Sequence, residues 1–362
     1  MSAITVGGDL VHYEVLGRGR PVILLHGWLG SWRYWIPTMR LLQLKYRVYA
    51  LDFFGYGDSG KNPAKYPPEQ QIILLDEFMK QLGIPKAAFI GHGLGAHITI
   101  EFARRNVERV ARMLLVSAPL FPPDNLANRV PPNKQVLLTP PPMAQQAAET
   151  IASRPPELSA QAGASDATIP SAANRTMGPN AIDRDALRKA AAEAALARGE
   201  AAMRGETVTA PLNRARELGV GSNPLRDVLS VGLDALVLRC FRKSDSDYKT
   251  LEPDLIKMDN QVLVHTSMNY DAGVVLDALR VLPTPTLLAH GMGDPIIPPP
   301  SDAVLNYISE DEGRHFAYYP LDEAKHFPML DHEPFMRLVT AFLETDDLNS
   351  IELKNRWKRR TR

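Results

Sequence analysis

Side chains that could carry acid–base chemistry follow short apolar runs near the C-terminal end of the chain. Asp294 comes soon after the apolar run 286–289, and His326 comes soon after the next run, 315–319. A histidine that is oriented by an aspartate can act as a general base and take a proton from water or from an acidic substrate. Such a pair requires a fold that brings both side chains to one place.

Apolar runs alternate with helical segments on both sides of the centre of the chain. Runs of this kind, separated by helices, indicate an α/β fold with a mostly parallel twisted sheet that has helices on both faces. Ligands of such sheets bind at the carboxyl ends of the strands. The residues that follow each strand are therefore the candidate site. We expect strands at 11–16, 21–25, 47–51, 87–90, 113–116, 286–289 and 315–319, and helices at 68–82, 96–105 and 333–342.

The middle of the chain has a different composition. No Phe, Trp or Tyr occurs between Pro122 and Cys240, and this stretch is rich in proline and alanine. Aromatic side chains usually anchor a core, so the stretch is not expected to be an independent domain. We expect a core of residues 1–121 and 270–345, an inserted helical, Pro/Ala-rich cap or lid at 122–269, and a basic tail at 346–362. Within the cap, 131–180 is expected to be mobile with one short helix at 144–153, and 182–203 is expected to be a helix.

Composition excludes several classes of protein. Lysine and arginine number 41, as do aspartate and glutamate, so the net charge is zero and nucleic acid is not an expected partner. The single cysteine, Cys240, excludes an intrachain disulfide and fits a reducing compartment. No run of about 18 apolar residues and no signal peptide is visible, so we expect a cytoplasmic protein without a membrane span.

Five segments, in this order along the chain, resemble the α/β-hydrolase fold superfamily. The resemblance implies that position 93 is the nucleophile position on a sharp turn, and that Asp294 orients the base His326. It further implies that the backbone N–H groups of Trp28 and Leu94 form an oxyanion hole. His26, Gly27, Phe53, Phe54 and His92 are then expected to line the ligand. The segments are His26–Gly30, Asp52–Ser59, Gly91–Gly95, Gly291–Pro298 and Ala324–Pro328.

The turn departs from the superfamily at its central position. It reads Gly91-His92-Gly93-Leu94-Gly95, where members of the superfamily carry Gly-x-Ser-x-Gly. Glycine has no group that can attack, and removal of the nucleophilic serine from a well-studied triad costs about 2 × 10⁶ in kcat. Ordinary two-step serine hydrolysis is therefore not expected. The missing hydroxymethyl group leaves space in which a water molecule could lie.

Three functions remain open. The first is a pseudo-hydrolase that uses its pocket to bind a ligand or a protein partner. The second is an enzyme without a covalent step, in which His326 and Asp294 activate water or abstract a proton from a small apolar ester, lactone or carbonyl compound. The third is a serine ester hydrolase inactivated by substitution at position 93. No metal or cofactor is expected in any of them.

Other nucleophiles have structural explanations in the sequence. We expect the hydroxyl groups of Ser31, Ser59 and Ser117 to form turn or cap hydrogen bonds, and Cys240 to be a small buried apolar side chain. The tail has six cationic residues between Lys354 and Arg362. It could contact a protein partner or an anionic membrane surface, although a solvated tail is the expectation.

Overall fold

The structure is a computed structural model that describes residues 2–131, 223–309, 316–330 and 332–351. One compact unit, formed by residues 1–142 and 223–362, contains all of the described residues. The helices expected at 144–153 and 182–203, the expected mobile segment beyond residue 131 and the basic tail from Lys354 lie outside them.

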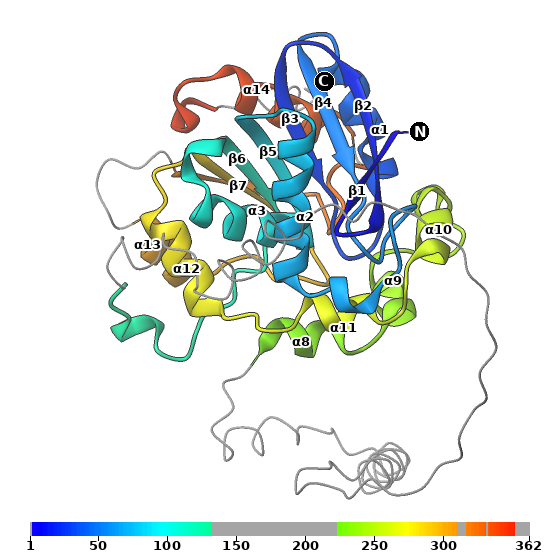
Figure 1. Cartoon of the computed structure of the whole chain (residues 1–362). Coiled ribbons are helices and arrows are strands. Elements are labelled where there is room, and N and C mark those ends of the chain that lie inside the picture. Colours follow the sequence, from blue (N-terminus) through cyan, green and yellow to red (C-terminus); the bar gives the residue numbers. More distant parts are fainter. Residues whose placement is uncertain (1, 132–222, 310–315, 331, 352–362) are drawn as a thin grey trace, which may run out of the picture. The chain divides into compact units, whose positions relative to one another are not determined.

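The centre of this unit is a sheet of eight strands in the order β1-β2-β4-β3-β5-β6-β7-β8 (Figure 1). The strands β3 to β8 are parallel, and β1 and β2 form an antiparallel edge. The mostly parallel sheet predicted from the sequence is thus confirmed. The strands are β1 Ser2–Val6, β2 Asp9–Gly17, β3 Arg20–Leu25, β4 Tyr46–Leu51, β5 Ala87–His92, β6 Val110–Val116, β7 Thr286–Gly291 and β8 Phe316–Leu321.

The edge strand β1 is absent from the sequence-based expectation. Its residues alternate between exposed and half-buried positions until Val6, so it lacks the apolar run that marks the inner strands. The inner strands β3, β4, β5 and β7 are buried over most or all of their length. This difference follows from position in the sheet, because an inner parallel strand is covered on both faces.

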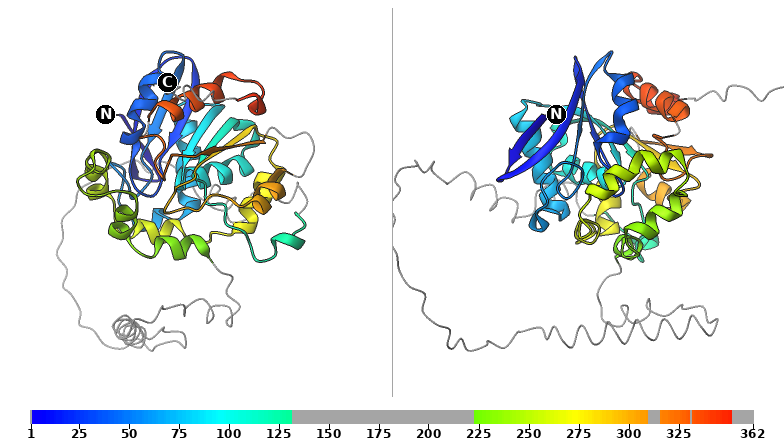
Figure 2. Two further views of the ribbon diagram at one scale, coloured as in Figure 1. Left: turned by 180° about the vertical axis from the view of Figure 1, so that it is seen from behind. Right: turned by 90° about the vertical axis from the view of Figure 1, so that its right-hand side faces the viewer.

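Helices cover both faces of the sheet (Figures 1 and 2). On one face α1 contacts α14, and on the other α3 packs on β5 and contacts α2 and α12, which in turn contacts α13. No helix among the described residues is long and apolar enough to cross a bilayer. These helices are α1 Ile36–Leu42, α2 Pro68–Gln81, α3 Leu94–Arg105, α12 Ala272–Val281, α13 Asp302–Ser309 and α14 His332–Glu344.

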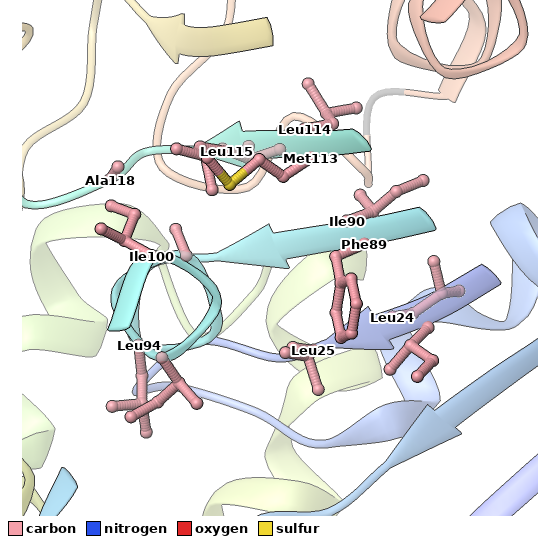
Figure 3. Packing of buried hydrophobic residues seen from close by; sticks show 14 of the residues in the cluster. Leu24, Leu25, Phe89, Ile90, Leu94, Ile100, Met113, Leu114, Leu115 and Ala118 are labelled. Carbon is pink, nitrogen blue, oxygen red and sulfur yellow. The ribbon is translucent and has the colours of Figure 1, made fainter. Parts of the chain in front are cut away.

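Side chains of β3, β5 and β6 form the core on which α3 rests. Figure 3 shows Leu25, Phe89 and Leu115 of these strands on the side of the sheet that carries α3, together with Leu94 and Ile100 of the helix, and all five are fully buried. Burial of each such side chain contributes roughly 1.5–3 kcal/mol. The turn between β5 and α3 is therefore anchored on both sides by the core.

Between β6 and α12, the described residues contain the helices α8 Pro224–Leu229, α9 Leu233–Cys240, α10 Ser246–Lys257 and α11 Val262–Thr266. Arg33 Nη1 donates to Asp254 Oδ1 of α10 at 2.9 Å, and the Phe241 ring after α9 lies 5.3 Å from that of Phe327. These contacts attach α9 and α10 to loops at the carboxyl ends of the strands. The short 3₁₀ helices are η1 Trp32–Trp35, η2 Pro63–Lys65, η3 Val107–Arg109, η4 Leu126–Asn128 and η5 Leu348–Ser350.

Candidate active site

The turn between β5 and α3 is as sharp as the sequence predicts. Gly93 has a φ of 51° and a ψ of −106°, and its N–H group donates to the Val116 carbonyl at 2.9 Å. The Gly95 N–H group donates to the His26 carbonyl at 3.0 Å, and a Cβ on Gly95 would lie 2.3 Å from the Leu25 carbonyl oxygen. The elbow geometry is therefore present although its central residue carries no side chain.

The indole of Trp28 lies directly against Gly93. A Cβ placed on Gly93 would be 3.1 Å from both Cε3 and Cζ3 of this ring, and Trp28 is 1% exposed. The ring narrows the space beside Gly93, and the water molecule expected there stays a prediction. The ring already borders the position at which a hydroxymethyl group would begin.

Asp294 and His326 form a hydrogen-bonded pair near the turn at Gly93. Asp294 lies in the loop after β7 and His326 in the loop after β8, and His326 Nδ1 donates to Asp294 Oδ2 at 2.8 Å. Both side chains are fully buried. The other carboxylate oxygen of Asp294 accepts the N–H groups of Ile296 and Ile297 at 2.8 and 3.0 Å. The carboxylate is therefore fixed from both sides.

This environment favours the ionised form of Asp294. Burial by itself raises the pKa of the carboxyl group, but the charge and hydrogen bond of His326 and the Ile296 amide outweigh it and lower the pKa to about 2. The aspartate therefore stays a hydrogen-bond acceptor for His326 Nδ1. This fixes the tautomer of His326 and leaves Nε2 as the nitrogen that can accept a proton.

His326 Nε2 is buried and has no hydrogen-bond partner among the described residues. Leaving a buried polar atom without a partner costs roughly 1–3 kcal/mol, so such an atom calls for a ligand, a water molecule or a chemical role. The backbone N–H groups of Trp28 and Leu94 also donate to no group of the described residues. The site thus offers one acceptor nitrogen and two donors.

A buried chain of hydrogen bonds joins the loop after β3 to the loop of His326. The Gly27 N–H group donates to Tyr34 Oη at 2.5 Å, and Tyr34 Oη donates to His92 Nδ1 at 3.0 Å. His92 Nε2 donates to the His326 carbonyl at 2.8 Å. Burial raises the pKa of Tyr34 and lowers that of His92, so both remain neutral. Tyr34 was missed from the sequence, where it reads only as one of several aromatic residues.

The remaining candidates for ligand contact are buried around the same loops. His26 donates from Nδ1 to the Gly27 carbonyl at 2.8 Å, and its Nε2 accepts the Phe53 N–H group at 3.1 Å. His26 and His92 therefore each use both ring nitrogens within the protein. Phe53 and Phe54 are fully buried, and Gln71 bonds both backbone polar groups of Phe54. Contact of these residues with a ligand stays a prediction.

The three serines differ from one another. Ser31 Oγ accepts from the Arg33 N–H group, and Ser59 Oγ donates to the Asp52 carbonyl, as expected. The expectation is wrong for Ser117, whose buried Oγ has no hydrogen-bond partner among the described residues. Ser117 also has a φ of 47°, a conformation that side chains rarely adopt. Cys240 is buried, and burial raises the pKa of its thiol to about 12.

Ser117 lies beside the turn at Gly93 and beside β7, the strand that precedes Asp294. It directly follows Val116, whose carbonyl accepts the Gly93 N–H group, and its own N–H group donates to the Ala289 carbonyl at 3.0 Å. Strained backbone and a buried hydroxyl without a partner occur together at functional sites more often than elsewhere. The sequence signal for this residue is only its place at the end of a central strand.

One cluster has side chains of types that bind metal ions. One possible ligand atom from each of His12, Asp52 and Asp58 lies within 4.8 Å of the others. These groups already have partners, since His12 Nδ1 bonds Asp52 Oδ2 at 3.1 Å and Asp58 pairs with Arg33 and Lys257. The contacts explain the cluster as a polar network that fixes loops.

Comparison with known proteins agrees with this fold. The family model described as alpha/beta hydrolase fold matches residues 20–171. Bifunctional epoxide hydrolase 2 of Rattus norvegicus is 37% identical over 123 residues, which are 32% of this chain and 22% of that protein. The soluble epoxide hydrolase of Corynebacterium sp. is 32% identical over 111 residues, 31% of this chain and 39% of that one. The chain thus spans well under half the length of these curated relatives.

The fold as a whole is similar to solved structures of esterases and lactonases. The enol-lactonase from Burkholderia xenovorans aligns with a TM-score of 0.55 at 16% identity, covering 95% of this chain and all of that one (100%). This likeness extends over the sheet and its helices and establishes the fold alone. Residues 20–171 thus match the alpha/beta hydrolase family model, and the chain has the α/β-hydrolase fold.

Proposed function

We propose that this protein is an enzyme that uses His326 as a general base without a covalent intermediate. The observation that carries the proposal is the buried His326–Asp294 pair at 2.8 Å, in which Nε2 of the histidine faces no partner among the described residues. The absence of a nucleophilic side chain at Gly93 removes the covalent step but leaves the base and the two amide donors. The substrate class is a small ester, lactone or related carbonyl compound.

The reaction balances with water as the nucleophile. His326 Nε2 takes a proton from a water molecule while the water oxygen bonds to the carbonyl carbon of the substrate. The N–H groups of Trp28 and Leu94 stabilise the negative oxygen that forms. When the intermediate collapses, the bond to the leaving oxygen breaks and the proton on His326 passes to that oxygen. Asp294 stays ionised throughout and stabilises the transient imidazolium.

A second function, binding of a ligand without turnover, is favoured by a different observation. The Trp28 ring lies against Gly93, where a Cβ would be 3.1 Å from two carbons of the indole. A pseudo-hydrolase of this kind would hold an apolar ligand against the indole. Its pocket would need no base, and replacement of His326 would change affinity instead of rate.

Initial rates of hydrolysis of p-nitrophenyl acetate separate these functions. General-base catalysis contributes about 10²–10⁴ in rate, so His326→Gln is expected to lower kcat at least about a hundredfold. The control is His265→Gln, because the His265 ring bonds the Pro63 carbonyl and contacts the Tyr66 ring, and neither of these belongs to the candidate site. Turnover that is equal in all three proteins, or absent from the native one, would contradict the proposal.

The third alternative, a serine hydrolase inactivated at position 93, is tested in the same assay by Gly93→Ser. Turnover that appears only with this variant, and is lost again on combination with His326→Gln, would support inactivation. Turnover by the native chain with the expected dependence on His326 would exclude it.

A further inference from the structure

The amino ends of the parallel strands form a face that the proposed site does not use. Arg20 begins β3, Tyr46 begins β4 and Lys86 immediately precedes β5. In a parallel sheet the amino ends lie at the edge opposite the carboxyl ends, where Gly93 and His326 are placed. This face is therefore independent of the reaction proposed above.

Two cavities on this face are lined by cationic side chains. The first, of about 410 Å³, lies between Arg18 and Arg47. The second, of about 240 Å³, is lined by Arg20, Lys86 and Arg112 among apolar residues. Neither cavity has an aspartate or glutamate in its lining. In a chain whose net charge is zero, this is a local concentration of positive charge.

Four of these cations are free to meet an anion. Arg18, Arg20, Arg47 and Lys86 are exposed, and none pairs with a carboxylate of the described residues. The neighbouring Lys45 is different, because it pairs with Glu344. The loop that carries Arg18 is held in place, since Gly17 and Gly19 pack so closely on the backbone of residues 43–46 that a Cβ on either would clash.

Apolar side chains are exposed beside these cations. Leu44, at the tip of the turn between α1 and β4, is 84% exposed, and Leu16 and Leu41 are 36% and 40% exposed. Cations interleaved with exposed leucines are typical of surfaces that rest on anionic membranes, where the charges meet lipid headgroups and the apolar side chains enter the interface.

The aromatic residues of this face argue against nucleic acid as the partner. Tyr46 and Tyr49 are buried, and the guanidinium groups of Arg20 and Arg47 lie over their rings at 5.6 and 5.4 Å. Single-stranded nucleic acid is bound by exposed rings on which bases stack, and these rings are covered.

We propose that the face formed by Arg18, Arg20, Leu44, Arg47 and Lys86 binds the surface of a membrane that contains anionic lipids. In this orientation the face rests on the headgroups, and the carboxyl ends of the strands point away from the bilayer. The protein is then a peripheral membrane protein.

Sedimentation of the full-length protein with vesicles tests this proposal. The vesicles are phosphatidylcholine alone, or phosphatidylcholine mixed with phosphatidylserine. We expect binding only to the mixed vesicles, with weaker binding as salt is raised. A cation near an anionic membrane contributes about fivefold to partitioning, so Arg18→Gln combined with Arg20→Gln is expected to weaken binding about 25-fold. Leu44→Ser is expected to weaken binding without changing its dependence on salt.

The control carries Arg226→Gln and Lys249→Gln, two exposed cations of α8 and α10. It should bind as the native protein does. Deletion of residues 354–362 shows whether the basic tail supplies the affinity instead. Failure of the native protein to bind mixed vesicles would overturn the proposal. Loss of binding on tail deletion alone, or tighter binding to a single-stranded oligonucleotide than to vesicles, would overturn it as well.

Discussion

Tyr34 Oη lies 3.0 Å from His92 Nδ1 and also accepts the Gly27 N–H group at 2.5 Å. Because His92 in turn donates to the His326 carbonyl at 2.8 Å, one phenol group joins the loop after β3 to the loop of His326. Neither Tyr34 nor His92 has a free polar atom in this chain of bonds. We infer that both are positioning residues.

Tyr34→Phe should therefore lower both stability and turnover. The change leaves the Gly27 N–H group and His92 Nδ1 buried without a partner, which costs roughly 1–3 kcal/mol of unfolding free energy. We expect kcat to fall by a larger factor than KM changes, because the loops that carry His326 and the Trp28 amide are no longer held in place relative to each other. Urea unfolding and initial rates measure the two effects. Tyr46→Phe is the control, since its hydroxyl makes one long bond of 3.3 Å to the Leu343 carbonyl. Equal losses in the two variants would disprove a special role for Tyr34.

Gly93→Ser and Gly93→Ala should destabilise the protein to a similar extent. Both place a Cβ on a residue with a φ of 51° and 3.1 Å from the Trp28 ring, and strain of this kind costs roughly 1–3 kcal/mol. Only the serine variant gains a group that can attack, so only it should form an acyl-enzyme with an ester. Thermal unfolding and intact-protein mass measure the two properties. An alanine variant as stable as the native protein would show that the Trp28 ring can move away from Cβ without a loss of unfolding free energy.

Ser117→Gly should change stability and activity in opposite directions. Ser117→Gly relieves the strain of a φ of 47° and removes a buried hydroxyl without a partner, so the variant should unfold at higher denaturant concentration. If the hydroxyl contacts substrate or water in the site, turnover should fall in Ser117→Gly and in Ser117→Ala alike. Ser59→Ala, which loses two satisfied hydrogen bonds, should instead be destabilised. A Ser117→Gly variant that is less stable than the native protein would contradict the assignment of strain.

The pKa of Asp294 predicts how stability depends on pH. Its carboxyl group has a pKa of about 2 against an ordinary value of 3.8. A lowered pKa contributes stability above the ordinary value, and this contribution is lost as the pH falls toward the lowered one. The difference corresponds to about 2 kcal/mol. Asp294→Asn should therefore reduce the unfolding free energy more at about pH 7 than at about pH 3, as urea titrations at the two pH values would show. A loss of unfolding free energy that is equal at the two pH values would mean that the charge of Asp294 does not stabilise its pair with His326.

The sequence predicts the parallel sheet because the inner strands consist of buried apolar residues. Leu24, Phe89 and Leu115 belong to apolar runs, which predict buried strands without information on the residues that pack against them. The pairing of Asp294 with His326 could be anticipated as well, because the segments that contain them resemble two motifs of the α/β hydrolases. The first inference is local along the chain, and the second rests on the resemblance.

The features that the sequence does not reveal depend on contacts between distant segments. The role of Tyr34 rests on His92, 58 residues away, and that of His92 rests on His326, 234 residues away. The position of the Trp28 ring over Gly93 and the unpartnered hydroxyl of Ser117 follow from packing of loops, which no spacing rule describes. The edge strand β1 lacks an apolar run because half of its surface is exposed.

The most direct test of the central claim is the intact mass of the native protein, quenched in acid while it hydrolyses p-nitrophenyl acetate. Direct attack by water predicts that product accumulates and depends on His326, while the mass of the protein stays that of the free chain. An added acetyl group that forms and decays during turnover, on Ser117, Cys240 or any other side chain, would contradict the claim that this site works without a covalent step.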